Sequence, residues 1–280
     1  MEKKILYISS CRECVVEKLS FMLRELGKRT KRPLWGKRFS PDEEVKALLY
    51  LDSGGRGNIY MMAKGMSADL TEYIFVDKAT GECYLLLTEM LKSEYKDGRF
   101  FYVSSRNSGV VFGNRAKVVN TLYGNKEVFL MSPSNAEKSP VYSAICGEVK
   151  KNTENGFLAE GDMAKLLLSK DVPSVIICDA FSASGAFGYF KSHFGNPVSI
   201  HLMNKDEHIY APFKFLGKEI FIETENFVKD ALFTISRWLC DSGEEGCAKR
   251  LNKAFASLSG GEELIERTVR EFTYTKRKRK

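Results

Sequence analysis

The sequence predicts an α/β protein with a Rossmann-like, mostly parallel sheet of about seven strands and helices on both faces. Short apolar runs alternate along the chain with longer segments whose apolar residues repeat at helical spacing. Most of these runs are continuous rather than alternating, which is typical of strands buried on both faces. With 280 residues, 44% of them hydrophobic, the chain can bury one large core.

The N-terminal segment, residues 1–40, is expected to hold a strand, a helix and a basic linker. Residues 4–8 are mostly apolar and predict the strand, and residues 15–26 place apolar side chains on one helical face. That face consists of Val15, Leu19, Met22, Leu23 and Leu26. A further helix is expected to begin at Ser40, because serine is a favoured N-cap and Pro41 suits the first helical position.

The main domain is expected to span residues 41–260, followed by a C-terminal helix and basic tail over 261–280. We expect its strands at 47–52, 72–77, 99–103, 127–131, 174–179, 198–203 and 219–223. We expect its helices at 58–65, 80–92, 141–151, 161–169, 186–194, 226–240 and 244–258. The glycine-containing segment 106–114 is expected to be a long loop within the sheet domain.

A glycine-rich turn follows the first strand of this domain. The apolar run 48–51 ends at Asp52, and three glycines follow within the next five residues. Glycine has no Cβ, so the backbone can approach a ligand closely, and the helix behind it offers unpaired N–H groups. A second apolar run, 73–76, ends at Asp77, where an acid can accept hydrogen bonds from a ribose. The pattern predicts a cradle for a nucleotide-type cofactor.

At these residues the chain resembles class I S-adenosylmethionine-dependent methyltransferases, whose first motif is a strand followed by a D/E-x-G-x-G-x-G loop. The likeness extends, as strand order and spacing, from about residue 45 to about residue 223. It implies that S-adenosylmethionine is the cofactor, that Asp77 binds its ribose, and that residues 41–260 form a methyltransferase-type domain. The implied cofactor-binding residues are Asp52, Ser53, Gly54, Gly55, Gly57, Asn58 and Asp77.

The resemblance also places the acceptor site after the fourth strand, in Ser132-Pro133-Ser134-Asn135. It implies that Ser132 and Asn135 face the methyl acceptor. The segment keeps a Ser-Pro pair but lacks the second proline and the aromatic residue of the amino-methylating enzymes. Two functions therefore stay open: a methyltransferase acting on RNA or DNA, and a catalytically inactive Rossmann-like subunit that binds nucleic acid or serves in assembly.

Two further alternatives rank below the loop after Asp52, which has more glycines and enough chain behind it to complete a seven-stranded sheet. Residues 179–185, Asp-Ala-Phe-Ser-Ala-Ser-Gly, repeat the order of acid, small-residue turn and helix, and could hold the cofactor instead. The order strand, helix, strand and Gly54-Gly55 also resembles the start of Clp-type serine proteases and crotonases, where such a pair forms an oxyanion hole. No complete triad accompanies it: Cys83 and the Ser104-Ser105 pair stand at the comparable places.

The charge pattern favours an acidic partner. Lysine and arginine total 43 against 36 acids, a formal net charge of +7, and the chain ends in five basic residues, 276–280. Six of the eleven residues from Lys28 to Arg38 are basic, which indicates either a solvated surface or contact with a phosphate backbone. The expected partner is nucleic acid, RNA rather than DNA, with a protein subunit as a further partner. The expected phosphate-binding residues are Lys28, Arg29, Lys31, Arg32, Lys37 and Arg38.

Other classes of function are disfavoured. No apolar stretch reaches the roughly 20 residues that a membrane span needs, and the N-terminus lacks a secretory pattern, so we expect an intracellular protein, cytoplasmic or nuclear. The seven cysteines are irregularly spaced, which indicates reduced thiols. Only one Cys-x-x-Cys pair, 11–14, occurs, and no metal site is expected. The three histidines are expected to be structural or on the surface.

Overall fold

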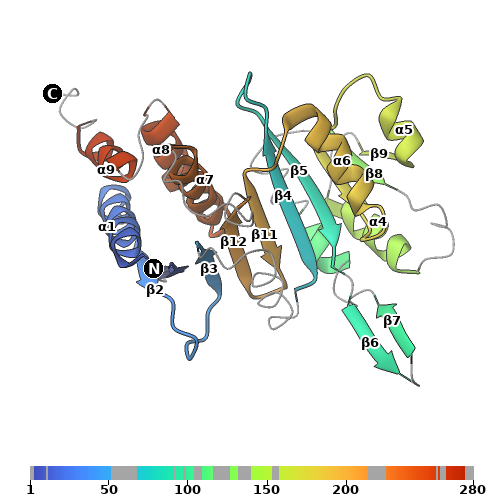
Figure 1. The fold of residues 1–280 in the computed structure, drawn as a ribbon, viewed down its shortest axis with the longest axis horizontal. Coiled ribbons are helices and arrows are strands. Elements are labelled where there is room, and N and C mark those ends of the chain that lie inside the picture. The colour runs from blue at the N-terminus through green and yellow to red at the C-terminus, as the bar shows by residue number, and fades with distance from the viewer. Residues whose placement is uncertain are drawn as a thin grey trace. The chain divides into compact units, whose positions relative to one another are not determined.

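The computed structural model describes residues 3–10, 12–51, 68–90, 92–96, 99–103, 109–115, 127–131, 140–152, 158–213, 225–256, 258 and 263–274. The protein belongs to the α/β class, as expected (Figure 1). Its contacts divide it into two compact units. Unit 1 comprises Met1–Met62 and Glu207–Lys280, and unit 2 comprises Ala63–Asp206. The segment 1–40 therefore shares a unit with the C-terminal helices.

The sheet of unit 1 is wholly parallel, in the order β2-β1-β3-β12. Its strands are β1 (Lys4–Ser9), β2 (Leu34–Arg38), β3 (Ala47–Tyr50) and β12 (His208–Pro212). The segment expected to be a basic linker thus contains β2, which pairs with β1 from Lys4↔Leu34 to Ile8↔Arg38. The sequence pattern did not predict β2, because an edge strand can carry polar and charged residues, such as Lys37 and Arg38, and then lacks a continuous apolar run.

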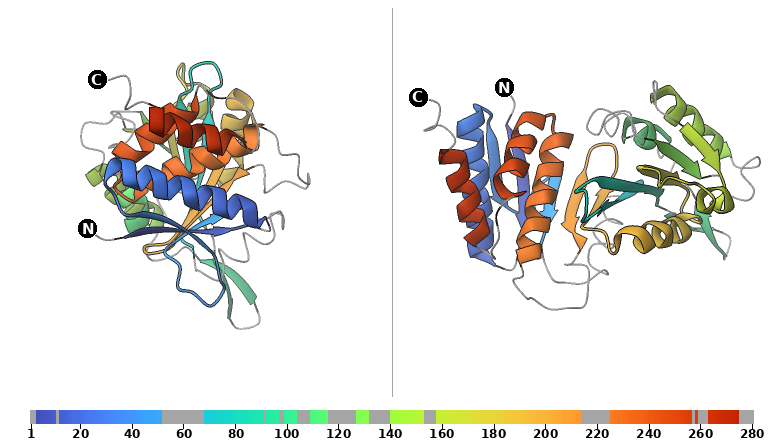
Figure 2. Two further views of the ribbon diagram at one scale, coloured as in Figure 1. Left: turned by 90° about the vertical axis from the view of Figure 1, so that its left-hand side faces the viewer. Right: turned by 90° about the horizontal axis from the view of Figure 1, so that it is seen from above.

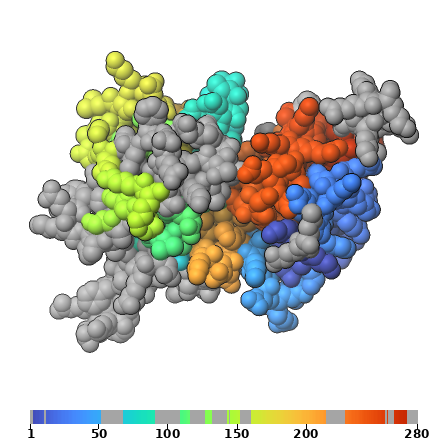
Figure 3. All heavy atoms as spheres, turned by 180° about the vertical axis from the view of Figure 1, so that it is seen from behind, coloured from blue at the N-terminus to red at the C-terminus, as the bar shows by residue number. Residues whose placement is uncertain are grey.

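The described helices of unit 1 cover one face of this sheet (Figure 2, left view). They are α1 (Glu13–Thr30), α7 (Glu225–Asp241), α8 (Glu245–Ala256) and α9 (Glu263–Tyr274). Leu6 and Ile8 of β1, Leu34 of β2 and Leu49 of β3 belong to one buried cluster with the apolar faces of these helices. In Figure 3 the N-terminal residues (blue) and the C-terminal helices (red) lie side by side, as this shared core requires. The predicted apolar face of α1 is confirmed.

Unit 2 holds a mixed sheet in the order β11-β4-β5-β10-β8-β9. The first two junctions are antiparallel and the other three are parallel. The strands are β4 (Leu70–Val76), β5 (Cys83–Glu89), β8 (Val128–Met131), β9 (Leu158–Gly161), β10 (Val175–Cys178) and β11 (Ser199–Met203). A separate hairpin pairs β6 (Lys92–Lys96) with β7 (Arg99–Val103). The helices of this unit include α4 (Pro140–Asn152), α5 (Met163–Leu167) and α6 (Ala183–Phe194).

Helices lie on both faces of this second sheet. Phe187 of α6 packs edge-on against Tyr73 and Phe75 of β4, with ring centroids 5.1 and 5.6 Å apart. Glu72, on the opposite face of the same strand, forms a bidentate ion pair with Arg115, which ends the helical segment 109–115. Both side chains are buried, with 0% and 4% of their surface exposed. The pair fixes that helix against the sheet.

Several expectations are wrong. The segment expected to be a helix at 80–92 contains strand β5. The prediction failed because the apolar residues of 83–89 are nearly continuous, and such a run fits a buried strand and a helix equally well. The expected helix start at Ser40 is a turn in which the Ser40 carbonyl accepts the Glu43 N–H. Part of the expected loop 106–114 is helical, at residues 109–115.

The number of strands also differs from the about seven expected. The described residues hold four strands in the sheet of unit 1, six in that of unit 2 and two in the separate hairpin. The helix expected at 58–65 and the strand expected at 219–223 lie outside the described residues.

Candidate nucleic-acid interface

Most residues of the predicted cofactor and acceptor sites lie outside the described part of the chain. This holds for Asp52, Ser53, Gly54, Gly55, Gly57 and Asn58, and for Ser132 and Asn135. The strand before the loop is confirmed as β3, whose parallel ladder with β1 continues to a hydrogen bond from Leu51 N–H to the Ser9 carbonyl, 2.8 Å long. The residues after β8, where the acceptor motif was expected, are likewise undescribed. Binding of S-adenosylmethionine there stays a prediction.

Asp77 lies in the tight turn that joins β4 to β5. One carboxylate oxygen accepts the Ala79 N–H at 2.9 Å, and the other accepts the Thr80 hydroxyl at 2.9 Å. Gly81 adopts a φ of +75°, the left-handed conformation that closes such turns. The Ala79 N–H, and after it the Thr80 hydroxyl, lower the pKa of this carboxyl group below its usual value. Both oxygens thus have a local structural role.

The surroundings of Asp77 differ from the predicted ribose site. A ribose-binding acid ends the strand that runs parallel to and beside the first strand of the cradle. Here β4 is antiparallel to both of its neighbours, β5 and β11, while β3 pairs with β1 and β12. The expectation that residues 72–77 form the next parallel strand is therefore wrong. The sequence predicted the strand but not its direction or its partners, because the local order of apolar residues carries no information about strand pairing.

The second acid-turn-helix segment is fully described. The Asp179 carboxylate accepts the Ser182 N–H at 2.7 Å, just before α6 begins, and the Asp179 carbonyl accepts the Thr88 hydroxyl at 3.3 Å. Asp179 is therefore engaged as a cap of the turn, which is the structural role that such acids commonly have. The residues of the hydrolase alternative are scattered: Cys83 begins β5, and Gly54, Gly55, Ser104 and Ser105 lie outside the described residues.

The predicted phosphate-binding residues are all described, and they lie at two ends of β2. Lys28 and Arg29 occupy the last turn of α1, and Lys31 and Arg32 lead from it into the strand. Lys37 and Arg38 lie at the other end. Five residues of strand correspond to about 16 Å at roughly 3.3 Å per residue. The six cations thus form two groups rather than the single grip that their spacing in sequence predicted.

The two groups differ in how their charge is compensated. At the C-terminal end of β2, Lys37 is paired with Glu43, and Arg38 donates to Glu13 at 2.9 Å. The hydrogen bond from Lys37 to Glu43 raises the pKa of that lysine. Both cations of this end therefore already hold a carboxylate.

At the N-terminal end, two cations are paired: Lys28 with Glu25 at 2.6 Å and Arg32 with Glu244 at 3.2 Å. Arg29 and Lys31 form no ion pair with any residue in the described ranges. Their positions have a structural cause in part, because cations are favourable at a helix C-terminus. Exposed ion pairs contribute only about 0–1 kcal/mol, so Lys28, which is 66% exposed, can exchange its carboxylate for a phosphate at low cost. Arg32 is held more firmly, because the side chain of its partner Glu244 is only 11% exposed.

Three lysines that sequence reasoning missed extend this group. Lys3 precedes β1 and Lys4 begins it, and the Lys4 N–H donates to the Pro33 carbonyl at 3.0 Å, beside the start of β2. Lys46 precedes β3 and is exposed. Because the three strands are parallel, their N-terminal ends meet at one edge of the sheet, where α1 also ends. We call this group the basic edge: Lys3, Lys4, Lys28, Arg29, Lys31, Arg32 and Lys46.

Other residues that could carry chemistry have structural roles. His193 Nδ1 lies 2.9 Å from the Tyr189 carbonyl, His201 is fully buried on β11, and His208 stacks on Tyr210. Within the described ranges no cluster of three or more histidine, cysteine or acidic residues could hold a metal ion. A search of the same residues finds no helix that is both long and apolar enough to cross a membrane.

The comparisons with known proteins show a fold and no family. No protein-family model matches the sequence, and no curated protein matches it. A solved structure, the isocitrate dehydrogenase from Methylococcus capsulatus, is similar with a TM-score of 0.64. The match covers 97% of this chain and 99% of that chain, at 10% sequence identity. At that identity the likeness concerns the arrangement of the backbone alone, so it shows that the two chains have similar α/β folds.

Proposed function

We propose that this protein binds nucleic acid through the basic edge of unit 1. The single observation that supports the proposal most is the convergence of seven lysine and arginine residues, from the starts of three parallel strands and the end of α1, where only two of them have a carboxylate partner among the described residues. Phosphate contacts by such side chains supply most of the affinity of non-specific nucleic-acid binding.

The chemistry of the edge suits a phosphate backbone. Arginine presents a planar fork of donors that matches a phosphate group, and lysine adds a mobile point charge. The net charge of +7 acts in the same direction at longer range. This proposal retains the nucleic-acid-binding alternative drawn from the sequence and narrows it to residues of one edge.

The proposal is tested by fluorescence anisotropy of labelled 20-nucleotide RNA and DNA oligomers, titrated with the full chain between 50 and 300 mM salt. We expect the logarithm of the association constant to fall linearly with the logarithm of the salt concentration. The basic tail must be separated from the edge, so the titration is repeated with Lys276, Arg277, Lys278, Arg279 and Lys280 replaced by glutamine. Binding that disappears in this variant would assign the affinity to the tail and refute the proposal.

Methyl transfer stays a separate prediction from the sequence resemblance. Calorimetric titration with S-adenosylmethionine tests it directly, and Asp77→Ala separates the two accounts of that residue. The resemblance predicts weaker binding of the cofactor by the variant. The turn in which both Asp77 oxygens are already engaged predicts unchanged binding and a less stable β4–β5 hairpin.

A further inference from the structure

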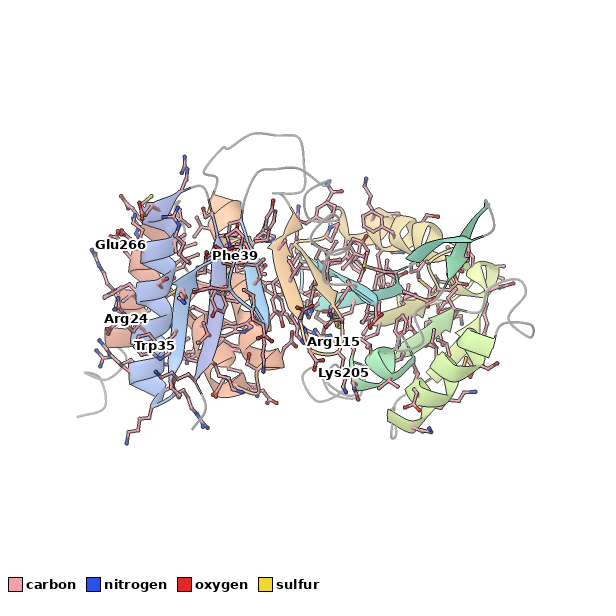
Figure 4. The ribbon with its side chains drawn as sticks, turned by 90° about the horizontal axis from the view of Figure 1, so that it is seen from below. Arg24, Trp35, Phe39, Arg115, Lys205 and Glu266 are labelled. Atoms are coloured by element: carbon pink, nitrogen blue, oxygen red, sulfur yellow. The ribbon has the colours of Figure 1, made fainter. Side chains whose placement is uncertain are left out.

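One face of β1 and β2 carries aromatic rings that no described helix covers. Leu34 belongs to the core beneath α1, and a Cβ on Gly36 would lie 2.7 Å from the Ser20 Cα of that helix, so residues 34 and 36 face α1. Trp35 and Lys37 alternate with them and face the opposite way. Paired residues of neighbouring strands share a face, so Tyr7, which pairs with Lys37, lies on the same side as Trp35. Figure 4 labels Trp35 on β2.

The exposure of Trp35 is unusual for this chain. Its side chain is 44% exposed, whereas the only other tryptophan, Trp238, is 2% exposed within the core. The face of each ring is occupied by a cation: Lys3 Nζ lies 5.7 Å from the centre of the Trp35 ring, and Lys37 Nζ lies 5.5 Å from that of Tyr7. A lysine ammonium sits on a flexible stem, so a ligand that stacks on the ring can take its place.

Resting on the proposed function, we infer that this face stacks the bases of a single-stranded nucleic acid, whose phosphates lie along the basic edge. A base that stacks on Trp35 takes the place of the Lys3 ammonium, which then pairs with a phosphate of the same strand. Aromatic side chains on a sheet are a recurrent means of binding unpaired bases, because every base presents a π-face once it is unstacked.

The spacing of the two rings selects against a duplex. Trp35 pairs with Ile5, two residues before Tyr7, so the two aromatic positions are about 8 Å apart by strand spacing and rise. Successive bases of a duplex strand lie only about 3.4 Å apart and are stacked on one another. Two bases can occupy the two rings only if they are separated, which a single strand permits.

The test uses the full chain with a 12-nucleotide oligouridine, its deoxy counterpart and a 12-base-pair RNA duplex. Trp35→Leu and Tyr7→Leu remove each ring but keep an apolar side chain. Phe21→Leu is the matched control, because Phe21 is also exposed, at 47%, and also carries a cation, Arg24, 5.9 Å from its ring centre, but lies on α1. Anisotropy measures affinity, and intrinsic fluorescence reports on Trp35, with Trp238 as a buried background.

We expect the wild-type protein to prefer either single strand over the duplex and its tryptophan fluorescence to be quenched on binding. Trp35→Leu and Tyr7→Leu should each weaken single-strand binding about 5- to 150-fold with little change in salt dependence. Phe21→Leu should bind like the wild type, and the quenching should be absent in Trp35→Leu.

Three results would overturn the inference. Salt-dependent binding that both ring variants retain would leave the proposed function intact and remove the stacking face. A dimer that becomes monomeric in Trp35→Leu would assign the face to a second copy of the chain. If the wild-type protein binds none of the three nucleic acids, the proposed function is refuted as well.

Discussion

Arg29 and Lys31 lie at the C-terminal end of α1, within the basic edge, and neither has an ion-pair partner among the described residues. Replacing both by glutamine removes their two positive charges. Each contact with a single strand contributes about 0.7 to the slope of log K against log salt, so losing two contacts should lower the slope by about 1.4. At 0.1 M salt the same relation gives an affinity loss of about 25-fold, or about 1.9 kcal/mol. Glutamine keeps a long side chain, so helix propensity changes little.

The assay is an anisotropy titration of labelled oligouridine at four salt concentrations. Lys170→Gln with Lys191→Gln is the matched control, because it removes the same charge from exposed positions of unit 2. Arg38→Gln should lower the slope less than Arg29→Gln, since Arg38 already pairs with Glu13. Equal losses in the edge variant and the unit 2 control would show that net charge alone governs binding, and the reasoning about the edge would fail.

Three further predictions concern unit 2. Arg115→Ala leaves the Glu72 carboxylate buried without its guanidinium, so the free energy of unfolding in urea should fall by about 3–5 kcal/mol; a loss below 1 kcal/mol would contradict the buried pair. Hydrogen bonds lower the Asp77 pKa, so they stabilise the fold above the ordinary pKa and the effect is lost as pH falls through the lowered value. Asp77→Ala should therefore reduce the thermal midpoint at pH 7, with the difference shrinking below about pH 4; a constant difference would refute this. Burial raises the pKa of Cys178 to about 12, so iodoacetamide at pH 8 should label exposed Cys14 in the native protein and Cys178 only in urea. Mass spectrometry of the labelled peptides checks it, and native labelling of Cys178 would count against the buried site.

The sequence predicted the elements whose periodicity is strong. The apolar face of α1, the helix α7 and the continuous runs of β3, β8 and β10 are where the pattern placed them. It failed where two structures share one pattern, as at β5, and where an edge strand carries charge, as at β2. It also could not give the direction of β4, because strand pairing depends on contacts between residues far apart in the chain.

The candidate site was predictable only in part. Clustered lysines and arginines at 28–38 were visible in the sequence, but which of them have a carboxylate partner depends in part on Glu13, Glu43 and Glu244, which lie outside that segment. The contribution of Lys3 and Lys46 required knowing that β1 and β3 are parallel neighbours. The stacking face required knowing which side of β2 packs against α1.

The central claim is most directly tested by mapping where RNA touches the protein. A single-stranded RNA carrying 4-thiouridine is crosslinked to the full chain by ultraviolet light, and the modified peptides are identified by mass spectrometry. We expect crosslinks in residues 3–9 and 28–38, with Tyr7 and Trp35 as attachment points. Crosslinks confined to unit 2 or to the tail 276–280 would contradict the account.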